Sequence, residues 1–444
     1  MKMPSQIHSE IKIIGHLAWP AVLGMLGGQL MNIVDMLMLG QLGEEAIATA
    51  GMGFLWSMPM VMFMLGCIRG MDPIITQAHG AGEKHRTGLA FARGFVIAAL
   101  IIPPAMAWHL CAPWSLELLK QPSHLIAQAS EYCAALMWGI PGMLIYQVQR
   151  GYLQGVGIMR PAAMVMLGAN LFNVPLNWIF MHGIMDMHGL GVAGCGWSTA
   201  LCQSILPVWL WHISKKDFTN IWPGSHGILN RKALLHQLEL GIPIAFQICF
   251  EAWAFNAAGL MIGTLGANPL AAHMIALNLA TAAWMFAMGI STAATTRVGN
   301  LLGAGKIWHI ASWVAIAISA MLMCVSALVF IFLPERLAQL YTSDQGVIEL
   351  AIILIPLAGA FQIVDGIQAV AGGILRGLAD VRIPAIGLII AHWFIGLPLG
   401  AYWAIVDNQG AAGVWWGLVV ALALTALFFS IRIHQLQRRG VQRI

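Results

Sequence analysis

The sequence predicts an all-α integral membrane protein with twelve transmembrane helices in two pseudo-symmetric six-helix bundles. Composition is the first observation: 59% of the 444 residues are hydrophobic and the mean hydropathy is +0.79, whereas a soluble domain is roughly 45–50% apolar. The second observation is that long apolar runs recur, and crossing about 30 Å of hydrocarbon takes around 20 residues of helix. The third is an internal repeat that relates the second half of the chain to the first.

The twelve spans are the apolar stretches between charged or Gly- and Pro-rich segments. We expect them near residues 13–40, 47–70, 88–111, 126–149, 161–183, 194–214, 234–264, 271–296, 307–333, 346–374, 384–406 and 411–431. The first run is longer than the apolar core of a signal peptide and contains Asp35. We therefore interpret it as a retained first span.

The basic residues indicate the orientation of the chain. With an even number of spans both termini lie on one side, and that side holds all of the 22 Lys and Arg residues except Lys120 and Arg336. The positive-inside rule then predicts that both termini are cytoplasmic. The net charge of +4 is explained by this topology and by anionic lipid headgroups, so we expect membrane lipids and no nucleic acid as partners.

Several classes of function are disfavoured by missing motifs. The chain has no Gly-x-x-x-x-Gly-Lys-Ser/Thr loop, so we expect no nucleotide as energy source. It has no recognisable catalytic constellation, so we expect no enzyme. The seven cysteines lie in or beside apolar spans without metal-ligand spacing, which predicts free thiols and neither a zinc site nor another cofactor. We expect the protein to be a monomer.

The internal repeat has a nearly constant register. Pro20 corresponds to Pro243, a shift of 223 (243 − 20), and the same shift carries residues 80–82 (Gly-Ala-Gly) onto residues 303–305. Residues 153–155 resemble residues 375–377 at a shift of 222. Because each repeat has six spans, both enter the membrane in the same orientation. A pseudo-twofold axis along the membrane normal is expected, with the substrate path between the halves.

The repeat and the spans together predict the organisation of the chain. We expect residues 1–12 to form a cytoplasmic N-terminal tail, 13–214 the N-lobe, 215–232 a cytoplasmic linker loop, 233–431 the C-lobe and 432–444 a basic cytoplasmic tail.

Three acidic residues, Asp35, Glu251 and Asp365, lie within long apolar runs. A charged side chain at the bilayer centre costs roughly 2.5–3.5 kcal/mol on insertion scales, so each is a functional-site candidate. No basic residue lies deep in a predicted span, and we therefore expect no structural ion pair with these acids.

In the N-lobe, Asp35 follows Asn32 by three residues, which places both on one helical face with Gln29 nearby. The fifth span has a similar polar face, formed by Asn170, Asn173 and Asn177. If the two faces meet, they form a cavity that can switch with the protonation of Asp35. The alternative for the asparagines is that they only join helices.

In the C-lobe, Glu251 and Asp365 have several polar neighbours in sequence or in neighbouring spans, namely Gln247, Gln362 and Asn278. Two carboxylates with amides suit a monovalent cation or a shared proton. Because hard oxygen ligands favour Na⁺ over soft metals, a Na⁺ site at this pair is one interpretation.

These features resemble the multidrug and toxic compound extrusion (MATE) family. The resemblance is carried by the segment Asn32-Ile33-Val34-Asp35, the loop 76–82, its partner 299–305 and residues 375–380. The presence of a carboxylate at both Glu251 and Asp365 resembles the pattern of the NorM-like branch of this family. In this branch a Tyr often precedes the Asp by four residues, whereas Phe361 stands here, which favours H⁺ over Na⁺.

The resemblance implies a V-shaped central cleft between two bundles in a bacterial cytoplasmic (inner) membrane. It also implies a C-lobe cation site at Glu251 and Asp365 and an N-lobe proton-linked substrate pocket at Asp35, Asn170 and Asn173. The predicted function is a secondary active antiporter that exports cationic amphipathic drugs and dyes in exchange for H⁺ or Na⁺ by alternating access. The alternative is a flippase for a lipid-linked precursor, which would favour several Arg or Lys in the cleft.

Overall fold

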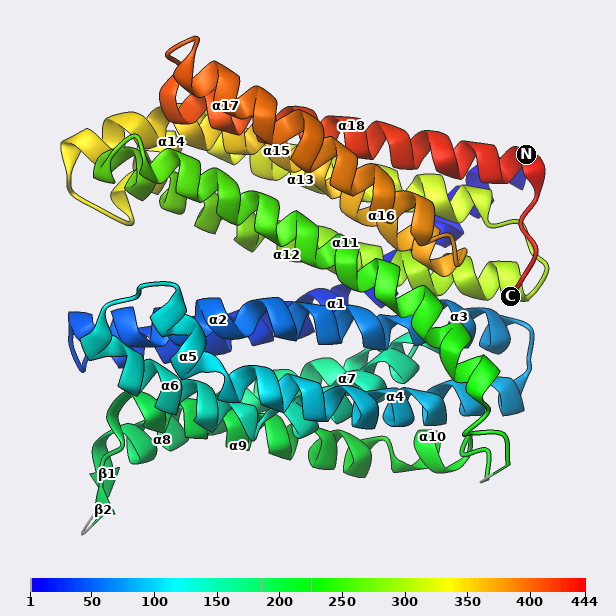
Figure 1. Ribbon diagram of the computed structural model, residues 1–444. Coiled ribbons are helices and arrows are strands. Elements are labelled where there is room, and N and C mark those ends of the chain that lie inside the picture. The colour runs from blue at the N-terminus through cyan, green and yellow to red at the C-terminus, as the bar shows by residue number, and fades with distance from the viewer. Residues whose placement is uncertain (1, 185–186, 225) are drawn as a thin grey trace. The chain divides into compact units, whose positions relative to one another are not determined.

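The computed structural model describes residues 2–184, 187–224 and 226–444, and most of them are helical (Figure 1). The α-helices are α1 (Lys2–Gly40), α2 (Glu44–Ile68), α3 (Asp72–Gly80), α4 (Lys84–Leu110), α5 (Ala112–Leu118), α6 (Ser123–Met137), α7 (Ile140–Gly155), α8 (Arg160–His182), α9 (Gly191–Ile213), α10 (Lys215–Thr219), α11 (Arg231–Gly263), α12 (Ala267–Gly303), α13 (His309–Phe332), α14 (Pro334–Gln339), α15 (Gln345–Gly377), α16 (Arg382–Ile389), α17 (Leu397–Ile405) and α18 (Gly410–Arg439). A 3₁₀ turn, η1 (Arg69–Met71), joins α2 to α3, and a π-helical segment, η2 (Ile390–Gly396), joins α16 to α17. Two short strands, β1 (Gly183–Ile184) and β2 (Met187–His188), pair antiparallel.

Ten helical segments of the described chain are long and apolar enough to cross a membrane. They are Ser5–Gly40, Glu44–Gly80, Lys84–Leu110, Arg160–His182, Arg231–Gly263, Ala267–Gly303, His309–Phe332, Gln345–Gly377, Arg382–Ile405 and Gly410–Arg439. The two other predicted spans are helical as well. The span near 126–149 consists of α6 and α7, which are separated at Trp138 and Gly139, and the span near 194–214 is α9, whose first turns are rich in Gly.

The π-helical segment η2 directly precedes a proline of α17. Pro398 has no N–H for the regular helical ladder, and its ring crowds the preceding turn. A local widening of the helix by one residue is one way to accommodate such a proline. The segment places His392 in the interior, where its Nδ1 contacts the Leu388 carbonyl at 3.0 Å.

The chain forms two compact units. Unit 1 contains Met1–Val22, Gly80–Gly82 and Phe246–Ile444, and unit 2 contains Leu23–His79 and Glu83–Ala245. Helices α1 and α11 thus contribute to both units. They divide after Val22 and after Ala245, and these two positions are related by the shift of the sequence repeat.

Unit 1 is built on α12, α13, α15 and α18, which pack against one another (Figure 1). Ile14 and Ala18 of α1 belong to the same apolar core. The ion pair between Arg297 and Glu10, with N–O distances of 2.6 and 2.8 Å, joins the beginning of α1 to α12. The first turns of α1 are therefore part of the packed unit.

Unit 2 is built on α2, α4, α6, α7, α8 and α9. Part of the predicted linker 215–232 packs on this unit. Phe218 of α10 is fully buried, with ring centroids 5.4 Å from Phe91 and 5.1 Å from Trp211. Arg93 donates a hydrogen bond of 2.8 Å to the Gly227 carbonyl. Phe218 and Gly227 therefore anchor the segment between the two repeats to unit 2.

The sequence repeat is also visible in the backbone. Lys306 N donates to Leu301 O at 2.9 Å, and Glu83 N donates to Ala78 O at 2.9 Å, so the two bonds close helix ends that correspond in the repeat. Each end requires a residue with positive φ, which is Gly82 (φ 76°) in one repeat and Gly305 (φ 65°) in the other. The same glycine-dependent helix ending therefore occurs in both repeats.

Later in the chain the shift between corresponding residues of the two repeats changes from 223 to 222, as the sequence predicts. Ile158 N bonds Leu153 O at 2.8 Å, and Asp380 N bonds Leu375 O at 2.9 Å. The residue with positive φ is Gly157 in the first turn, whereas it is Ala379 (φ 62°) in the second. The turn geometry is thus retained although a side chain replaces the glycine hydrogen.

Candidate functional site

Asp35 of α1 is buried in unit 2, and both of its carboxylate oxygens accept hydrogen bonds. Asn177 of α8 donates from Nδ2 to Oδ1 at 2.6 Å, and Thr199 of α9 donates from Oγ1 to Oδ2 at 3.0 Å. Short bonds to a carboxylate are stronger than bonds between neutral groups. Three helices therefore hold this carboxylate in a fixed position inside the unit.

The asparagines of α8 extend this polar group. Asn177 also donates to Oδ1 of Asn173 at 3.2 Å, whereas Asn173 Nδ2 and Asn177 Oδ1 are buried without a partner. Asn170 donates to the Gly27 carbonyl of α1 at 2.9 Å. Of the predicted polar face of α1, Asp35 therefore meets the asparagines of α8, and the unpaired amide atoms of these asparagines could bind water or a ligand.

Two predicted members of this group lie elsewhere on α1. Asn32 is exposed and Gln29 is partly exposed, whereas Asp35 is buried. Residues three apart on a helix point about 60° away from each other, which is enough for Asp35 to face the interior while Asn32 does not. Thr199 was not predicted. Its only signal in the sequence is a hydroxyl in the apolar sixth span.

In unit 1, Glu251 and Asp365 lie close enough to interact electrostatically. Glu251 of α11 accepts a hydrogen bond from Nε2 of Gln368 at 3.1 Å. Asp365 is buried on α15, three residues before Gln368, and accepts no hydrogen bond from the described side chains. The structure thus brings the two predicted carboxylates together and adds Gln368, which was not predicted.

The amide oxygens near the pair suit a hard cation. Gln362 is buried one turn before Asp365 and neither of its amide atoms has a partner, and Gln368 Oε1 also lacks one. No cluster of three or more His, Cys, Asp or Glu side chains occurs within the ranges that the structure describes. A cation bound here would therefore be held by two carboxylates and by amide oxygens.

Three other predicted residues have different surroundings. Phe361 belongs to the apolar core, with ring centroids 5.7 Å from Phe255 and 5.5 Å from Trp415. Asn278 is exposed on α12 and accepts a hydrogen bond from the Tyr341 hydroxyl at 3.4 Å. No hydrogen bond between Asn278 and either carboxylate occurs in the described chain. Gln247 lies one turn before Glu251 on α11 and faces Gly372, where an added Cβ would be 3.7 Å from its Nε2.

The expectation that no structural ion pair holds these acids stays a prediction, but a basic side chain does lie near the pair. Helix α15 extends to Gly377, beyond the predicted end at 374, and includes Arg376. This side chain is half-buried, its charge acts on Glu251, and its Nη2 donates to Ser291 Oγ at 3.4 Å. The spacing in the sequence could have indicated this position of Arg376. Placed on a single helix, Gln362, Asp365, Gln368 and Arg376 follow one face.

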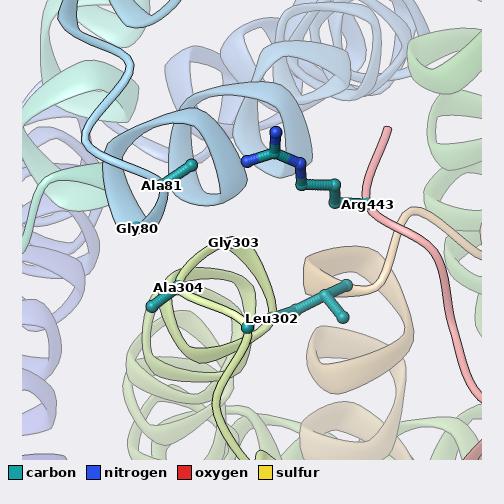
Figure 2. Close-up of a pocket in the computed structure, with 7 residues that line it drawn as sticks. Gly80, Ala81, Leu302, Gly303, Ala304 and Arg443 are labelled. Carbon is teal, nitrogen blue, oxygen red and sulfur yellow. The ribbon is translucent and has the colours of Figure 1, made fainter.

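Unit 1 also contains a pocket of about 460 Å³ away from the carboxylates (Figure 2). It is lined by the two repeat-related turns and by the tail residue Arg443, whose guanidinium points between them. Gly80 has to be a glycine here, because a Cβ would lie 2.1 Å from the Asn300 carbonyl. The lining has no carboxylate, so the pocket does not suit a cation.

Buried carboxylates in two repeated helical bundles are typical of ion-coupled membrane carriers. The MatE family model matches residues 20–179 and 243–402, two segments related by the shift of the sequence repeat. The chain belongs to the multidrug and toxic compound extrusion (MATE) family. The resemblance inferred from the sequence motifs is therefore confirmed.

Curated relatives match over nearly their whole length. The multidrug resistance protein MdtK of Pectobacterium atrosepticum is 31% identical over 99% of this chain and 98% of its own. PmpM of Pseudomonas aeruginosa is 32% identical over 98% of this chain and 94% of its own. NorM of Burkholderia vietnamiensis is 33% identical over 94% of this chain and 92% of its own.

Solved structures confirm the fold. The eukaryotic MATE transporter AtDTX14 superposes with a TM-score of 0.88 at 19% identity and covers 96% of both chains. A second match is a multidrug resistance MATE transporter of the MOP superfamily in an outward-facing conformation. It has a TM-score of 0.88 at 21% identity and covers 96% of this chain and 97% of its own. The predicted twelve-helix, all-α fold is therefore that of MATE transporters.

Proposed function

We propose that the protein is a secondary active multidrug efflux antiporter that exports cationic amphipathic compounds in exchange for H⁺ or Na⁺ by alternating access. Full-length similarity to proteins named for multidrug resistance supports the substrate class. The observation that carries the coupling mechanism is the placement of Asp35 in one unit and of Glu251 with Asp365 in the other. We propose a transporter and not an enzyme, acting as a monomer.

In this proposal Asp35 is the proton-linked switch of the N-terminal repeat. A carboxylate with donors on both oxygens can hold a proton or attract a cationic drug, but binding of one disfavours the other. Asn173 and Asn177 have unpaired amide atoms next to it, which could bind polar groups of the substrate. Competition of this kind couples the two ligands because each lowers the affinity for the other.

The carboxylates Glu251 and Asp365 would form the cation site of the C-terminal repeat. Their mutual repulsion disfavours the empty, doubly charged state, so a proton or Na⁺ is attracted into the site. Phe361 offers no hydroxyl as a ligand one turn before Asp365, and we therefore favour H⁺.

The protein would work in the bacterial cytoplasmic (inner) membrane with both termini in the cytoplasm. Each elementary charge that moves across the membrane contributes about 2.3 kcal/mol per 100 mV of membrane potential. A flippase for a lipid-linked precursor would need a basic site for a pyrophosphate. The basic side chain near the described carboxylates, Arg376, acts on Glu251 of an acidic pair, and such surroundings do not favour a pyrophosphate.

The test is efflux of ethidium from cells that express each variant. Asp35→Asn, Glu251→Gln and Asp365→Asn should insert normally and each should reduce efflux at least about tenfold, because each removes a charge needed for exchange. The matched control is Glu349→Gln, which neutralises an exposed carboxylate at the beginning of α15. Efflux that is unchanged in all three variants would contradict the proposal.

A further inference from the structure

Helix α15 carries a continuous polar face through unit 1. Gln362, Asp365 and Gln368 follow one another at intervals of three, and Arg376 lies eleven positions beyond Asp365. Eleven positions are about three turns, so Arg376 faces the same side of the helix as Asp365. Gly372 stands halfway between Gln368 and Arg376 and has no side chain to separate the two groups.

Neighbouring contacts show where the Arg376 guanidinium lies. Ser291 Oγ donates to the Ala369 carbonyl at 2.6 Å, and Arg376 Nη2 donates to the same Ser291 Oγ at 3.4 Å. One hydroxyl thus links the guanidinium to a backbone carbonyl about two turns earlier on the same helix. The Arg376 side chain therefore extends back along α15 toward Gln368.

Glu251 lies at the same level. It accepts its hydrogen bond from Gln368, the residue next to Ala369. Helices α11 and α15 also approach each other at a second level. Gln247, one turn before Glu251 on α11, faces Gly372, one turn after Gln368 on α15. Arg376 acts on Glu251 through space, and the charged neighbour that acts on Asp365 is Glu251. The basic group is thus placed beside one carboxylate of the pair.

We propose that Arg376 is a built-in counter-cation of the Glu251–Asp365 pair, so that the empty site carries one net negative charge and takes up one monovalent cation. This inference rests on the proposed antiport function. A guanidinium stays protonated in proteins, so its charge is constant through the cycle. Two carboxylates and one guanidinium then leave a single charge to be balanced by the coupling ion.

The arrangement gives the two acids different roles. Glu251 keeps a permanent partner, whereas Asp365 has no hydrogen-bond donor among the described side chains and depends on the arriving cation. Without Arg376 the pair would hold two uncompensated charges in a low-dielectric interior, which is strongly unfavourable. Loss of either carboxylate leaves a neutral site that no longer attracts a cation.

A charge-rescue experiment tests this proposal in proteoliposomes with inwardly directed H⁺ and Na⁺ gradients imposed together. Glu251→Gln should reduce gradient-driven ethidium exchange at least about tenfold, and Glu251→Gln/Arg376→Gln should recover to within about threefold of wild type, a coupling of the size seen for residues in contact. Asp365→Asn/Arg376→Gln is the second rescue pair. Arg376→Lys, which keeps the charge, should retain exchange when introduced alone.

The control pair is Glu251→Gln/Lys306→Gln, which removes an exposed positive charge beyond α12 and should not rescue. A purely structural role of Arg376 predicts that the double variants are no better than the single carboxylate variants, and this result would overturn the proposal. If well-folded wild type shows no gradient-driven exchange, the proposed antiport function fails and the inference fails with it. If wild type exchanges but neither pair is rescued, the inference alone fails.

Discussion

At the residue scale, the N-terminal site depends on two hydrogen bonds to one carboxylate. Asn177 and Thr199 come from different helices and donate to different oxygens of Asp35. Hydrogen bonds to charged groups contribute about 1.5–3 kcal/mol each. The loss of either donor therefore changes how strongly Asp35 holds a proton or a cationic substrate.

Thr199→Val should reduce ethidium efflux by about 3- to 10-fold, because the isosteric side chain removes one donor to Asp35 and leaves the packing nearly unchanged. The matched control is Ser204→Ala on the same helix, whose hydroxyl bonds only its own helix at Ala200 O, 2.8 Å away. Efflux rates in cells with equal protein levels are the measurement. Equal rates for both variants would show that Thr199 does not act on Asp35.

Phe361→Tyr should make efflux depend more on Na⁺, because a hydroxyl would be added one turn before Asp365, where it can act as an oxygen ligand. Efflux at fixed pH with and without Na⁺ measures the effect. Phe361 packs against Phe255 and Trp415, so Phe255→Tyr is a control for an added hydroxyl in the same core. An equal Na⁺ response in both variants would contradict a specific role of position 361.

The acids of both sites could be predicted from the sequence because each is costly in an apolar span. Their partners could not. Thr199 and Gln368 are ordinary polar residues whose role depends on which helices touch, and periodicity within one span does not determine this. Arg376 was missed for another reason: the predicted span ended two residues before it, although the helix continues to Gly377.

At the element scale, α2 and the first half of α11 pack with almost no space between them in unit 2. An added Cβ at Gly66 would lie 2.2 Å from Ala245 Cα, and one at Gly241 would lie 2.3 Å from the Cys67 carbonyl. Small residues allow helix backbones to approach closely in membranes, where van der Waals packing drives association. These glycines therefore determine the position of α11.

Gly66→Ala should lower the free energy of unfolding by about 1–3 kcal/mol, the usual cost of overpacking, and reduce the thermal midpoint in detergent. The matched control is Gly51→Ala on the same helix, which has no atom within 4 Å of the added Cβ and gains helix propensity. If both variants have the same midpoint, the contact with α11 does not limit stability.

The sequence predicted the helices better than their ends. All twelve predicted spans are helical, but several helices extend further, and the first begins at Lys2 and not near residue 13. Hydropathy detects the apolar part of a helix, whereas the polar turns beyond it are held by contacts such as the Arg297–Glu10 ion pair. These contacts depend on packing and are not visible in the local sequence.

At the scale of the whole molecule, two repeats share a backbone pattern but differ in their acids. The helix endings at Gly82 and Gly305 are equivalent, whereas Asp35 corresponds to Ala258 and Glu251 to Gly28 at the same shift. The duplicated scaffold therefore carries one carboxylate in the first repeat and a pair in the second. This asymmetry is the physical basis for assigning the two sites different tasks.

The central claim is that buried carboxylates couple drug export to an ion gradient. Transport of ethidium in proteoliposomes, with the H⁺ and Na⁺ gradients imposed independently and without ATP, tests it most directly. We expect wild type to exchange ethidium along the pH gradient and the Asp35→Asn, Glu251→Gln and Asp365→Asn variants to lose this response. Ethidium movement that ignores both gradients, or that follows them equally well without these carboxylates, would contradict the account.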